Sequence, residues 1–301
     1  WLTQRWLRKL GFNLAEQICR QSTAIPPLTI RTNTLRCSRD QLKERLRYEG
    51  YAVKQTVVSP VGLIMDKFGP LTGLKPLEEG WCYVEDEAAQ LVPFLLDVKP
   101  GQRLLDACAA PGGKSTHLAA LMHNEGEIVS IDRSARRLKT LKENMERLDI
   151  TCIRPRVGTW DGNVKIPFSL ASMLEEGFDG ILVDAPCSGL GVLRRHPEAK
   201  WQKTGQQLVK YQSVQGEILN RVSTYLRPGG VLVYSACSTE PEETLHVISR
   251  FCHEHPEFQH ESALPFLPPG SEDLINSDGN LMTLGSVYDM DGFFAVRLRR
   301  S

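Results

Sequence analysis

The sequence predicts an α/β protein in which a small α+β module precedes a doubly wound, seven-stranded, mainly parallel sheet. Three observations support this fold class. From about residue 82 onward, short apolar stretches alternate with longer amphipathic ones, which is the pattern of strands and crossover helices in a parallel sheet. Between residues 26 and 80, one amphipathic stretch is flanked by shorter strand-like stretches. The length of 301 residues suits two domains of ~150 residues each.

The N-terminal part begins with a predicted helix over residues 1–20, where apolar residues recur at every fourth position. Gly11 weakens this helix near its middle, and Pro26-Pro27 ends helical structure. The elements expected next are a strand at 28–34, a helix at 38–47 with Ser38 as its N-cap, and strands near 51–58 and 61–66. These patterns define two predicted segments, a helical segment at 1–25 and a small α+β module at 26–80.

The third predicted segment, residues 81–301, carries the larger sheet. Its strands are expected at 103–108, 127–132, 151–157, 178–184, 231–235, 280–284 and 292–299. Its helices are expected at 114–122, 136–148, 206–226 and 241–254. This order indicates a Rossmann-like, doubly wound domain that ends in a pair of closing strands.

The composition excludes several classes of protein. Hydrophobic residues make up 41% of the chain, and no apolar run approaches the ~18 residues of a membrane span. Without a signal-peptide pattern at the start, a cytoplasmic protein is expected. The eight cysteines include no Cys-x-x-Cys pair, so neither a metal site nor a disulfide framework is expected. Residues 1–60 hold 11 Lys and Arg against 4 Asp and Glu, which fits a phosphate-binding face or, equally, a solvated helix surface.

Acidic residues stand at the ends of four successive predicted strands. They are Asp106, Asp132, Asp161 and Asp184. In a doubly wound sheet, ligands bind beyond the carboxyl ends of the strands, and an acid about 20 residues after the glycine turn accepts hydrogen bonds from ribose hydroxyls. Asp132 stands 20 residues after Gly112. The four acids together predict a nucleoside-binding site.

The glycine-containing loop after the first strand identifies the kind of nucleoside. Its sequence, CAAPGGKS at 108–115, has Cys108 where a P-loop needs glycine, and it lacks the G-x-G-x-x-G spacing of a dinucleotide fold. A nucleoside triphosphatase and a dehydrogenase are therefore disfavoured. A Pro-Gly-Gly turn lets the backbone approach a ligand without phosphates, and an acid-rich pocket suits the sulfonium of S-adenosylmethionine.

Two cysteines follow neighbouring strands and predict the reaction. Cys187 lies in Asp-Ala-Pro-Cys after the fourth strand, and Cys237 lies in Ser-Ala-Cys after the fifth. A thiolate that attacks C6 of cytosine makes C5 nucleophilic enough to accept a methyl group, and Asp184 is placed to stabilise the adduct at N3. Burial is the alternative for a single cysteine, but two at adjacent strand ends favour function.

Two competing reactions do not fit these motifs. Enzymes that methylate exocyclic amines carry Asp or Asn followed by Pro-Pro and an aromatic residue at the fourth strand, whereas this sequence has Asp184-Ala-Pro-Cys. The stretch His196-Pro-Glu198 has the His-x-Glu shape of a zinc deaminase, but no Pro-Cys-x-x-Cys follows it.

These motifs resemble those of the Nop/Sun-type RNA cytosine-C5 methyltransferases. The segments that carry the resemblance are CAAPGGKST (108–116), DAPCSGLG (184–191), YSACS (234–238) and DGFFAVRL (291–298). The stretch VLRRHPEAKW (192–201) is similar to the RsmB (Sun/Fmu) branch, which acts on small-subunit ribosomal RNA. The resemblance extends over roughly residues 20–301. It departs from the family at Ala236, where threonine is usual, and at the start, which lacks a NusB-like domain.

The resemblance implies a role for individual residues. The loop around the methionine part of S-adenosylmethionine would consist of Cys108, Ala109, Ala110, Pro111, Gly112, Gly113 and Lys114. Asp132 would hold the ribose, Asp161 would lie by the adenine amine, and Asp184 would contact both cofactor and target base. Cys237 would be the nucleophile and Cys187 would help release the product; the residues alone do not decide which cysteine attacks.

RNA is the expected partner, bound by a protein that is expected to be a monomer. The residues predicted to contact RNA phosphates are Arg31 and Arg36 in the small module, and Arg194, Arg195 and His196 after Cys187. For the last three, a helix N-terminus with solvated charges is the alternative. Trp160 and Trp201 could stack on bases, but core packing is the expected role for each. The same chemistry on tRNA or another RNA, and a non-catalytic ribosome-assembly factor, remain alternatives.

Overall fold

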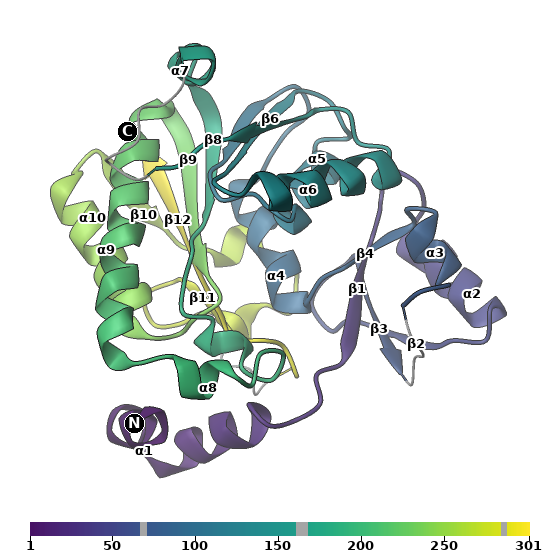
Figure 1. The fold of residues 1–301 in the computed structure, drawn as a ribbon, viewed down its shortest axis with the longest axis horizontal. Coiled ribbons are helices and arrows are strands. Elements are labelled where there is room, and N and C mark those ends of the chain that lie inside the picture. Colours follow the sequence, from purple (N-terminus) through teal and green to yellow (C-terminus); the bar gives the residue numbers. More distant parts are fainter. Residues whose placement is uncertain (67–70, 161–167, 284–287) are drawn as a thin grey trace.

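The computed structural model describes residues 1–66, 71–160, 168–283 and 288–301. Figure 1 shows three parts along the chain: an N-terminal helix, a small sheet with its own helices, and a large sheet with helices on both faces. The predicted fold class is confirmed, because a small α+β part precedes a large, mostly parallel sheet. The predicted domain boundaries stay predictions.

Helix α1 (Leu2–Gln21) has a kink at its middle. Gly11 takes φ 75° and ψ 174°, values outside the helical region that a glycine adopts without strain. Leu2 and Trp6 are buried before the kink and Ala15 after it, against Leu190, Leu193, Ala199 and Leu208 of the large domain. The predicted apolar stripe therefore changes direction at Gly11, and Leu7 and Leu10 are exposed.

The small sheet is antiparallel, with the strand order β2-β3-β1-β4. Its strands are β1 (Leu28–Thr32), β2 (Ala52–Gln55), β3 (Gly62–Asp66) and β4 (Cys82–Val84). Helix α2 (Arg39–Tyr48) begins with the capping box predicted at Ser38, whose hydroxyl accepts a hydrogen bond from the backbone N–H of Gln41. Leu42 and Leu46 of α2 pack on the sheet, and the short helix α3 (Lys75–Glu78) leads into β4.

The large sheet has the strand order β10-β12-β9-β8-β5-β6-β7, and β11 pairs with β12 beside this path. Its strands are β5 (Arg103–Asp106), β6 (Glu127–Asp132), β7 (Ile153–Val157), β8 (Phe178–Asp184), β9 (Leu226–Ala236), β10 (Phe258–Glu261), β11 (Leu281–Thr283) and β12 (Phe293–Arg300). The part of the chain that the structure describes thus adds one strand, β10, to the predicted seven. Strands β5 to β9 are parallel, whereas β12 runs antiparallel to β9 and to β10.

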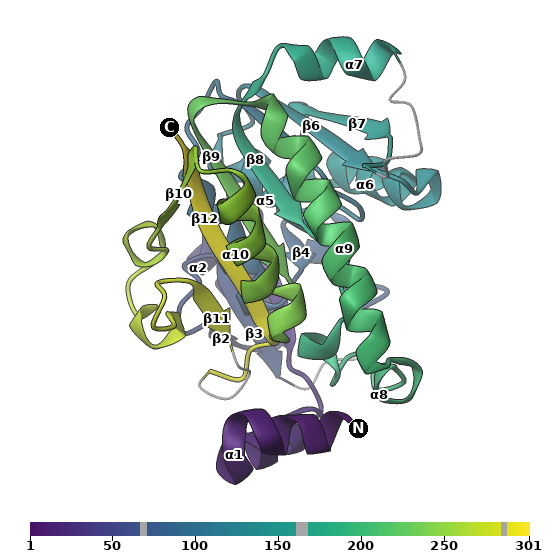
Figure 2. The same ribbon diagram turned by 90° about the vertical axis from the view of Figure 1, so that its left-hand side faces the viewer.

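Helices cover both faces of the large sheet, as the two views show (Figures 1 and 2). On one face lie α4 (Glu87–Leu91), α5 (Gly113–Leu121) and α6 (Ala135–Leu148). On the other lie α9 (Gly205–Val222) and α10 (Leu245–Glu254). Among the described residues, the large domain also has the α-helices α7 (Phe168–Glu175) and α8 (Ala199–Gln202).

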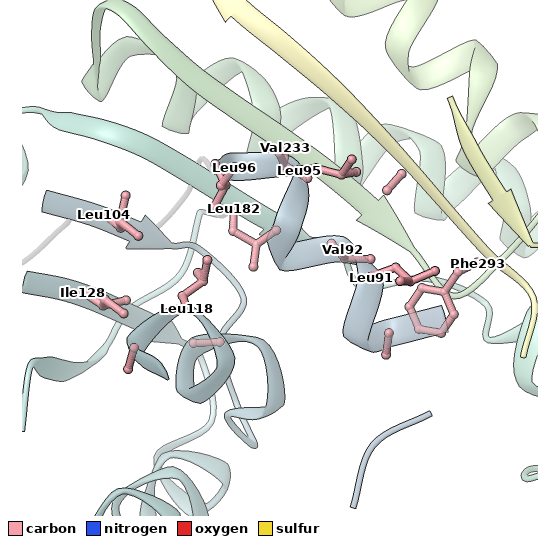
Figure 3. Close-up of a cluster of buried hydrophobic side chains, with 14 of the residues drawn as sticks. Leu91, Val92, Leu95, Leu96, Leu104, Leu118, Ile128, Leu182, Val233 and Phe293 are labelled. Atoms are coloured by element: carbon pink, nitrogen blue, oxygen red, sulfur yellow. The ribbon is translucent and has the colours of Figure 1, made fainter. Parts of the chain in front are cut away.

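The central strands β5, β6, β8 and β9 of the large sheet supply apolar side chains to both faces alternately. Leu104 and Leu182 point into the cluster with α4 and α5, drawn in Figure 3, whereas Leu105 and Ile181 belong to the cluster under α9 and α10. Burying one such leucine stabilises the fold by about 1.5–3 kcal/mol, so both faces hold the sheet rigidly. The carboxyl ends of the central strands are therefore fixed positions for functional side chains.

Candidate active site

A cavity of about 600 Å³ opens at the carboxyl ends of β5, β6, β8 and β9. Residues 83–85, at the end of β4 in the small sheet and just after it, also line the cavity, so it lies where the two parts of the protein meet. The predicted site residues that line it are Cys108, Ala109, Ala110, Pro111, Gly113, Lys114, Asp132, Asp184, Cys187 and Cys237. Gly112 shapes the loop without lining the cavity, and Asp161 lies outside the described residues.

The loop of residues 108–114, called the glycine loop below, turns β5 into α5. Gly112 is the N-cap of α5 with φ 109°, and a Cβ there would lie 2.4 Å from Cδ1 of Leu141. Backbone strain therefore disfavours a side chain here, and a Cβ would also require Leu141 to shift. The backbone N–H of Ala110 donates to Oδ2 of Asp132 over 3.1 Å, which ties the glycine loop to the end of β6.

Asp132 is placed as predicted, at the end of β6 and on the cavity wall. It is 5% exposed. Its Oδ1 accepts from the backbone N–H of Ser134 over 2.8 Å, and Arg137 lies 3.5 Å from Oδ2. These contacts fix the carboxylate while leaving lone pairs on both oxygens for a ligand hydroxyl.

Asp106 is a further acid of the cavity, beneath the glycine loop. Oδ2 accepts a hydrogen bond from the Ser115 hydroxyl over 2.6 Å, whereas the buried Oδ1 has no partner within the protein. Burial raises the pKa of Asp106 to about 7, with Ser115 opposing the shift. A buried oxygen without a partner costs free energy unless a ligand supplies a donor. The site therefore fits a ligand that carries an amino or hydroxyl group at this point.

Lys114 and Asp184 form an ion pair at the centre of the cavity. The Lys114 ammonium lies 2.7 Å from Oδ2 of Asp184, and the Ser235 hydroxyl donates to Oδ1 over 2.8 Å. Burial lowers the pKa of Lys114, but the carboxylates of Asp184 and Glu85 outweigh it and raise the pKa on balance. Lys114 therefore carries its proton between two acids.

The two predicted cysteines meet beside this ion pair. Their sulfurs are 2.9 Å apart, and both cysteines are free thiols. The hydrogen bond with Cys237 and burial raise the pKa of Cys187 well above its ordinary value. Cys187 therefore keeps its proton and can donate it toward the Cys237 sulfur. Burial likewise raises the pKa of Cys108, the third cysteine of the cavity, so Cys108 is an unreactive thiol.

Arg31 lies at the junction of the two parts, where it is buried. Its guanidinium donates to Glu85 over 2.7 Å, to the Gly113 carbonyl over 2.6 Å and to the Thr116 hydroxyl over 2.9 Å. The side chain is 2% exposed, so it holds the glycine loop instead of presenting a charge to RNA. Arg36 is exposed, and its contact with RNA stays a prediction.

The basic residues after Cys187 also differ from one another in exposure. Arg194 is buried and donates to Asp291 over 2.7 Å, and Arg195 bridges Asp86 and Asp291. Their guanidinium groups therefore anchor the loop through Asp291, and the burial of Arg194 speaks against its predicted phosphate contact. Arg195 is 28% exposed, and its contact with RNA stays a prediction. His196 is exposed and remains a candidate for contact with RNA.

The two tryptophans have opposite environments. Trp160 is buried, as predicted, and donates to the Ala107 carbonyl over 2.7 Å at the edge of the cavity. Trp201, on the four-residue helix α8, is 88% exposed, so its predicted core packing is wrong.

Sequence reasoning missed Glu85 as part of the site. It lines the cavity from the end of β4, pairs with Arg31 and lies near Lys114. Its only sequence signal is its place after a three-residue strand. Among the described residues, no group of three or more acidic, histidine or cysteine side chains could hold a metal ion, and no helix is long and apolar enough to cross a membrane.

Comparison with protein families gives two matches. A family model described as 16S rRNA methyltransferase RsmB/F matches residues 93–299, and one described as a ferredoxin-like domain of RsmF/B-like methyltransferases matches residues 1–72. The "Probable ribosomal RNA small subunit methyltransferase B" of Bacillus subtilis (strain 168) is 35% identical over 300 residues, which are 100% of this chain and 66% of that protein. The chain spans just under two thirds of that relative's length.

Two further proteins are similar to this chain. The "Ribosomal RNA small subunit methyltransferase B" of Pseudomonas syringae pv. tomato (strain ATCC BAA-871 / DC3000) is 38% identical over 257 residues, 82% of this chain and 54% of that protein. The crystal structure of PH0851 superposes with a TM-score of 0.90 at 29% identity, over 100% of this chain and 65% of that one. These similarities agree with the motifs that carried the resemblance in the sequence.

Proposed function

Because this chain belongs to the RsmB/F family of 16S rRNA methyltransferases, we propose that it transfers a methyl group from S-adenosylmethionine to C5 of a specific cytosine in RNA, with small-subunit ribosomal RNA as the substrate. The observation that carries the proposal is the contact between Cys187 and Cys237, 2.9 Å apart, beside the Lys114–Asp184 ion pair. Methylation of an exocyclic amine needs no thiol, whereas methylation at C5 needs a nucleophile. The names of the relatives support RNA as substrate, and we propose that the enzyme acts as a monomer in the cytoplasm.

The cavity suits S-adenosylmethionine, which would supply the methyl group as an electrophile on its sulfonium. The glycine loop would enclose the methionine part, and Asp132 would accept hydrogen bonds from the ribose hydroxyls. The free Oδ1 of Asp106 suits the amino group of the methionine part. Asp161 remains the proposed partner of the adenine amine.

The chain's own residues would then activate the base. The Cys237 sulfur forms a bond with C6 of the flipped cytosine, and the electrons of the C5–C6 double bond become available at C5. The proton that neutralises the adduct at N3 would come from the Lys114 ammonium by way of the Asp184 carboxylate, to which Lys114 donates. After methyl transfer, a base accepts the proton of C5, the electrons of the C5–H bond re-form the C5–C6 double bond, and the C6–sulfur bond breaks to return the thiolate. Cys187 would assist this release, a role that rests on the family resemblance.

The proposal is tested with in-vitro transcribed small-subunit ribosomal RNA and labelled S-adenosylmethionine. Wild type, Cys237→Ala and Cys187→Ala are compared in a methyl-transfer assay and on a denaturing gel. The expected result is 5-methylcytosine from wild type, no product from Cys237→Ala, and a protein–RNA adduct that accumulates with Cys187→Ala. An adduct from Cys237→Ala but none from Cys187→Ala would reverse the two roles. If wild type binds RNA but neither transfers a methyl group nor forms an adduct on ribosomal RNA or tRNA, the proposed reaction is wrong.

A further inference from the structure

One buried carboxylate connects the backbone segments of the two active-site cysteines. Each cysteine is followed by a serine, Ser188 after Cys187 and Ser238 after Cys237, and both hydroxyls donate to Oε2 of Glu243. The distances are 2.5 Å from Ser188 and 2.6 Å from Ser238. The backbone N–H of Ser188 donates to Oε1 over 2.6 Å. Glu243 thus accepts three hydrogen bonds from the two segments that carry the thiols.

Glu243 itself is held from a third direction. It ends a short 3-10 helix, Pro241–Glu243, and its backbone carbonyl accepts from the Tyr234 hydroxyl over 2.6 Å. The side chain is fully buried, with an exposed fraction of 0%. Burial raises the pKa of Glu243, and the three donors oppose that shift. A buried carboxylate with this many donors has one low-energy position, so the serines bound to it have one as well.

The placement of Glu243 suggests more than a contribution to stability. The contact between the sulfurs at 2.9 Å depends on where two separate loops end, and a displacement on the order of 1 Å at a reacting group can cost about 10²-fold in rate. A buried serine can bind locally, as Ser271 does when it donates to the Pro268 carbonyl over 2.6 Å. Ser188 and Ser238 instead converge on one carboxylate, which stands five residues after Ser238 and 55 residues after Ser188 in the sequence.

We propose that Glu243 is a positioning residue that sets the separation of the Cys187 and Cys237 thiols by binding Ser188 and Ser238 with one carboxylate. This inference rests on the proposed function, because it assigns the two serine hydrogen bonds to Glu243 to different steps of that reaction. We call them the Ser188 arm and the Ser238 arm. The Ser238 arm places the sulfur that attacks C6. The Ser188 arm places the sulfur that assists release.

The variants Ser188→Ala, Ser238→Ala, Glu243→Ala and Glu243→Gln test the two arms, with Ser271→Ala as the matched buried-serine control. In single-turnover reactions with small-subunit ribosomal RNA, Ser238→Ala should slow adduct formation at least about 10-fold. Ser188→Ala should form the adduct at the wild-type rate but accumulate it. Glu243→Ala should show both defects. Glu243→Gln should remain near wild type, because its amide oxygen can accept from the Ser188 N–H and its two N–H groups can donate to the two hydroxyls.

A second readout needs no RNA and so separates this inference from the proposed function. Diamide oxidises two adjacent thiols to a disulfide; the sulfurs lose two protons and two electrons, and diamide gains them as a hydrazine. Wild type and Ser271→Ala should form the Cys187–Cys237 disulfide rapidly, as seen by mass spectrometry of thiol-blocked peptides. Ser188→Ala and Ser238→Ala should form it at least about 10-fold more slowly, as expected when the sulfurs separate.

The results separate the proposed function from the positioning role of Glu243. If wild type transfers no methyl group but the serine variants slow disulfide formation, the proposed function fails and the positioning role stands. If wild type is active and both serine variants match it in adduct kinetics and in disulfide formation, Glu243 does not position the thiols. If the serine variants lose as much thermal stability as Ser271→Ala, and neither adduct formation nor release changes specifically, the role of Glu243 is structural only.

Discussion

Replacing Arg31 with methionine removes the charge that joins the small sheet to the glycine loop. Methionine retains the apolar stem of the side chain, but the ion pair with Glu85 and the hydrogen bonds to the Gly113 carbonyl and the Thr116 hydroxyl are lost. Both charged side chains are buried, with exposed fractions of 2% for Arg31 and 6% for Glu85. The variant therefore leaves a carboxylate in the interior without its main partner.

The expected cost is about 3 kcal/mol in the free energy of unfolding. Breaking one side of a buried ion pair costs roughly 3–5 kcal/mol. The lower end applies here because Lys114 lies near Glu85 and can partly replace the lost charge. That replacement draws Lys114 from Asp184, so Arg31→Met should also weaken the site that those two residues form.

Urea unfolding followed by circular dichroism measures the effect. Arg20→Met is the control, because Arg20 is 78% exposed in its pair with Glu16 and should cost only about 0.3–0.5 kcal/mol. The double variant Arg31→Met/Glu85→Gln should lose less than the sum of the single variants, by about 0.5–3 kcal/mol. If Arg31→Met lowers the free energy of unfolding by less than about 1 kcal/mol, the buried ion pair does not stabilise the junction of the two parts. The same conclusion follows if the costs of the two single variants simply add in the double variant.

Three further predictions follow from the environments of single side chains. Trp160→Ala should destabilise the protein by about 3–5 kcal/mol in urea unfolding, whereas Trp201→Ala should stay within about 0.5 kcal/mol of wild type; similar costs would contradict their assigned burial. Asp132→Ala should weaken binding of S-adenosylmethionine at least about 10-fold by isothermal titration calorimetry, since a hydrogen bond to a charged group contributes roughly 1.5–3 kcal/mol; unchanged affinity would place the ribose elsewhere. Asp106, with its pKa raised to about 7, binds a proton in the folded protein that the unfolded chain releases near pH ~4, so wild-type stability should fall between these values as the pH rises. Asp106→Asn should lose less stability over the same pH window, and parallel pH profiles for the two proteins would mean that Asp106 is ionised when folded.

Local sequence pattern was sufficient for most of the large sheet. The strands predicted at 127–132 and 178–184 coincide with β6 and β8, because their apolar side chains alternate between two buried faces. The site followed from the same pattern, since parallel strands bring their carboxyl ends to one edge. Asp132, Asp184 and Cys237 therefore lie around one cavity although their strands are far apart in the sequence.

The failures concern partners that are distant in the sequence. Arg31 and Arg194 lie in basic stretches of sequence, which are typical of a phosphate-binding surface. Their carboxylate partners, however, stand 54 and 97 residues away in the sequence. An arginine that meets such a partner is buried, and no local pattern distinguishes it from an exposed one. Strand β10 was missed because its four residues, Phe258–Glu261, include only one apolar side chain.

The position of β12 makes completion of the site depend on a stretch of chain that is synthesised after both active-site cysteines. β12 lies between β9 and β10, so a ribosome releases β9, with Cys237 just beyond it, well before the strand that pairs with its free edge. Asp291, the anchor of Arg194, emerges only with that same strand. Until then the nascent chain has an unpaired edge, which can bind other chains, and an untethered segment beside Cys187. Closure of the sheet and anchoring of the segment beside Cys187 therefore depend on the same stretch of chain.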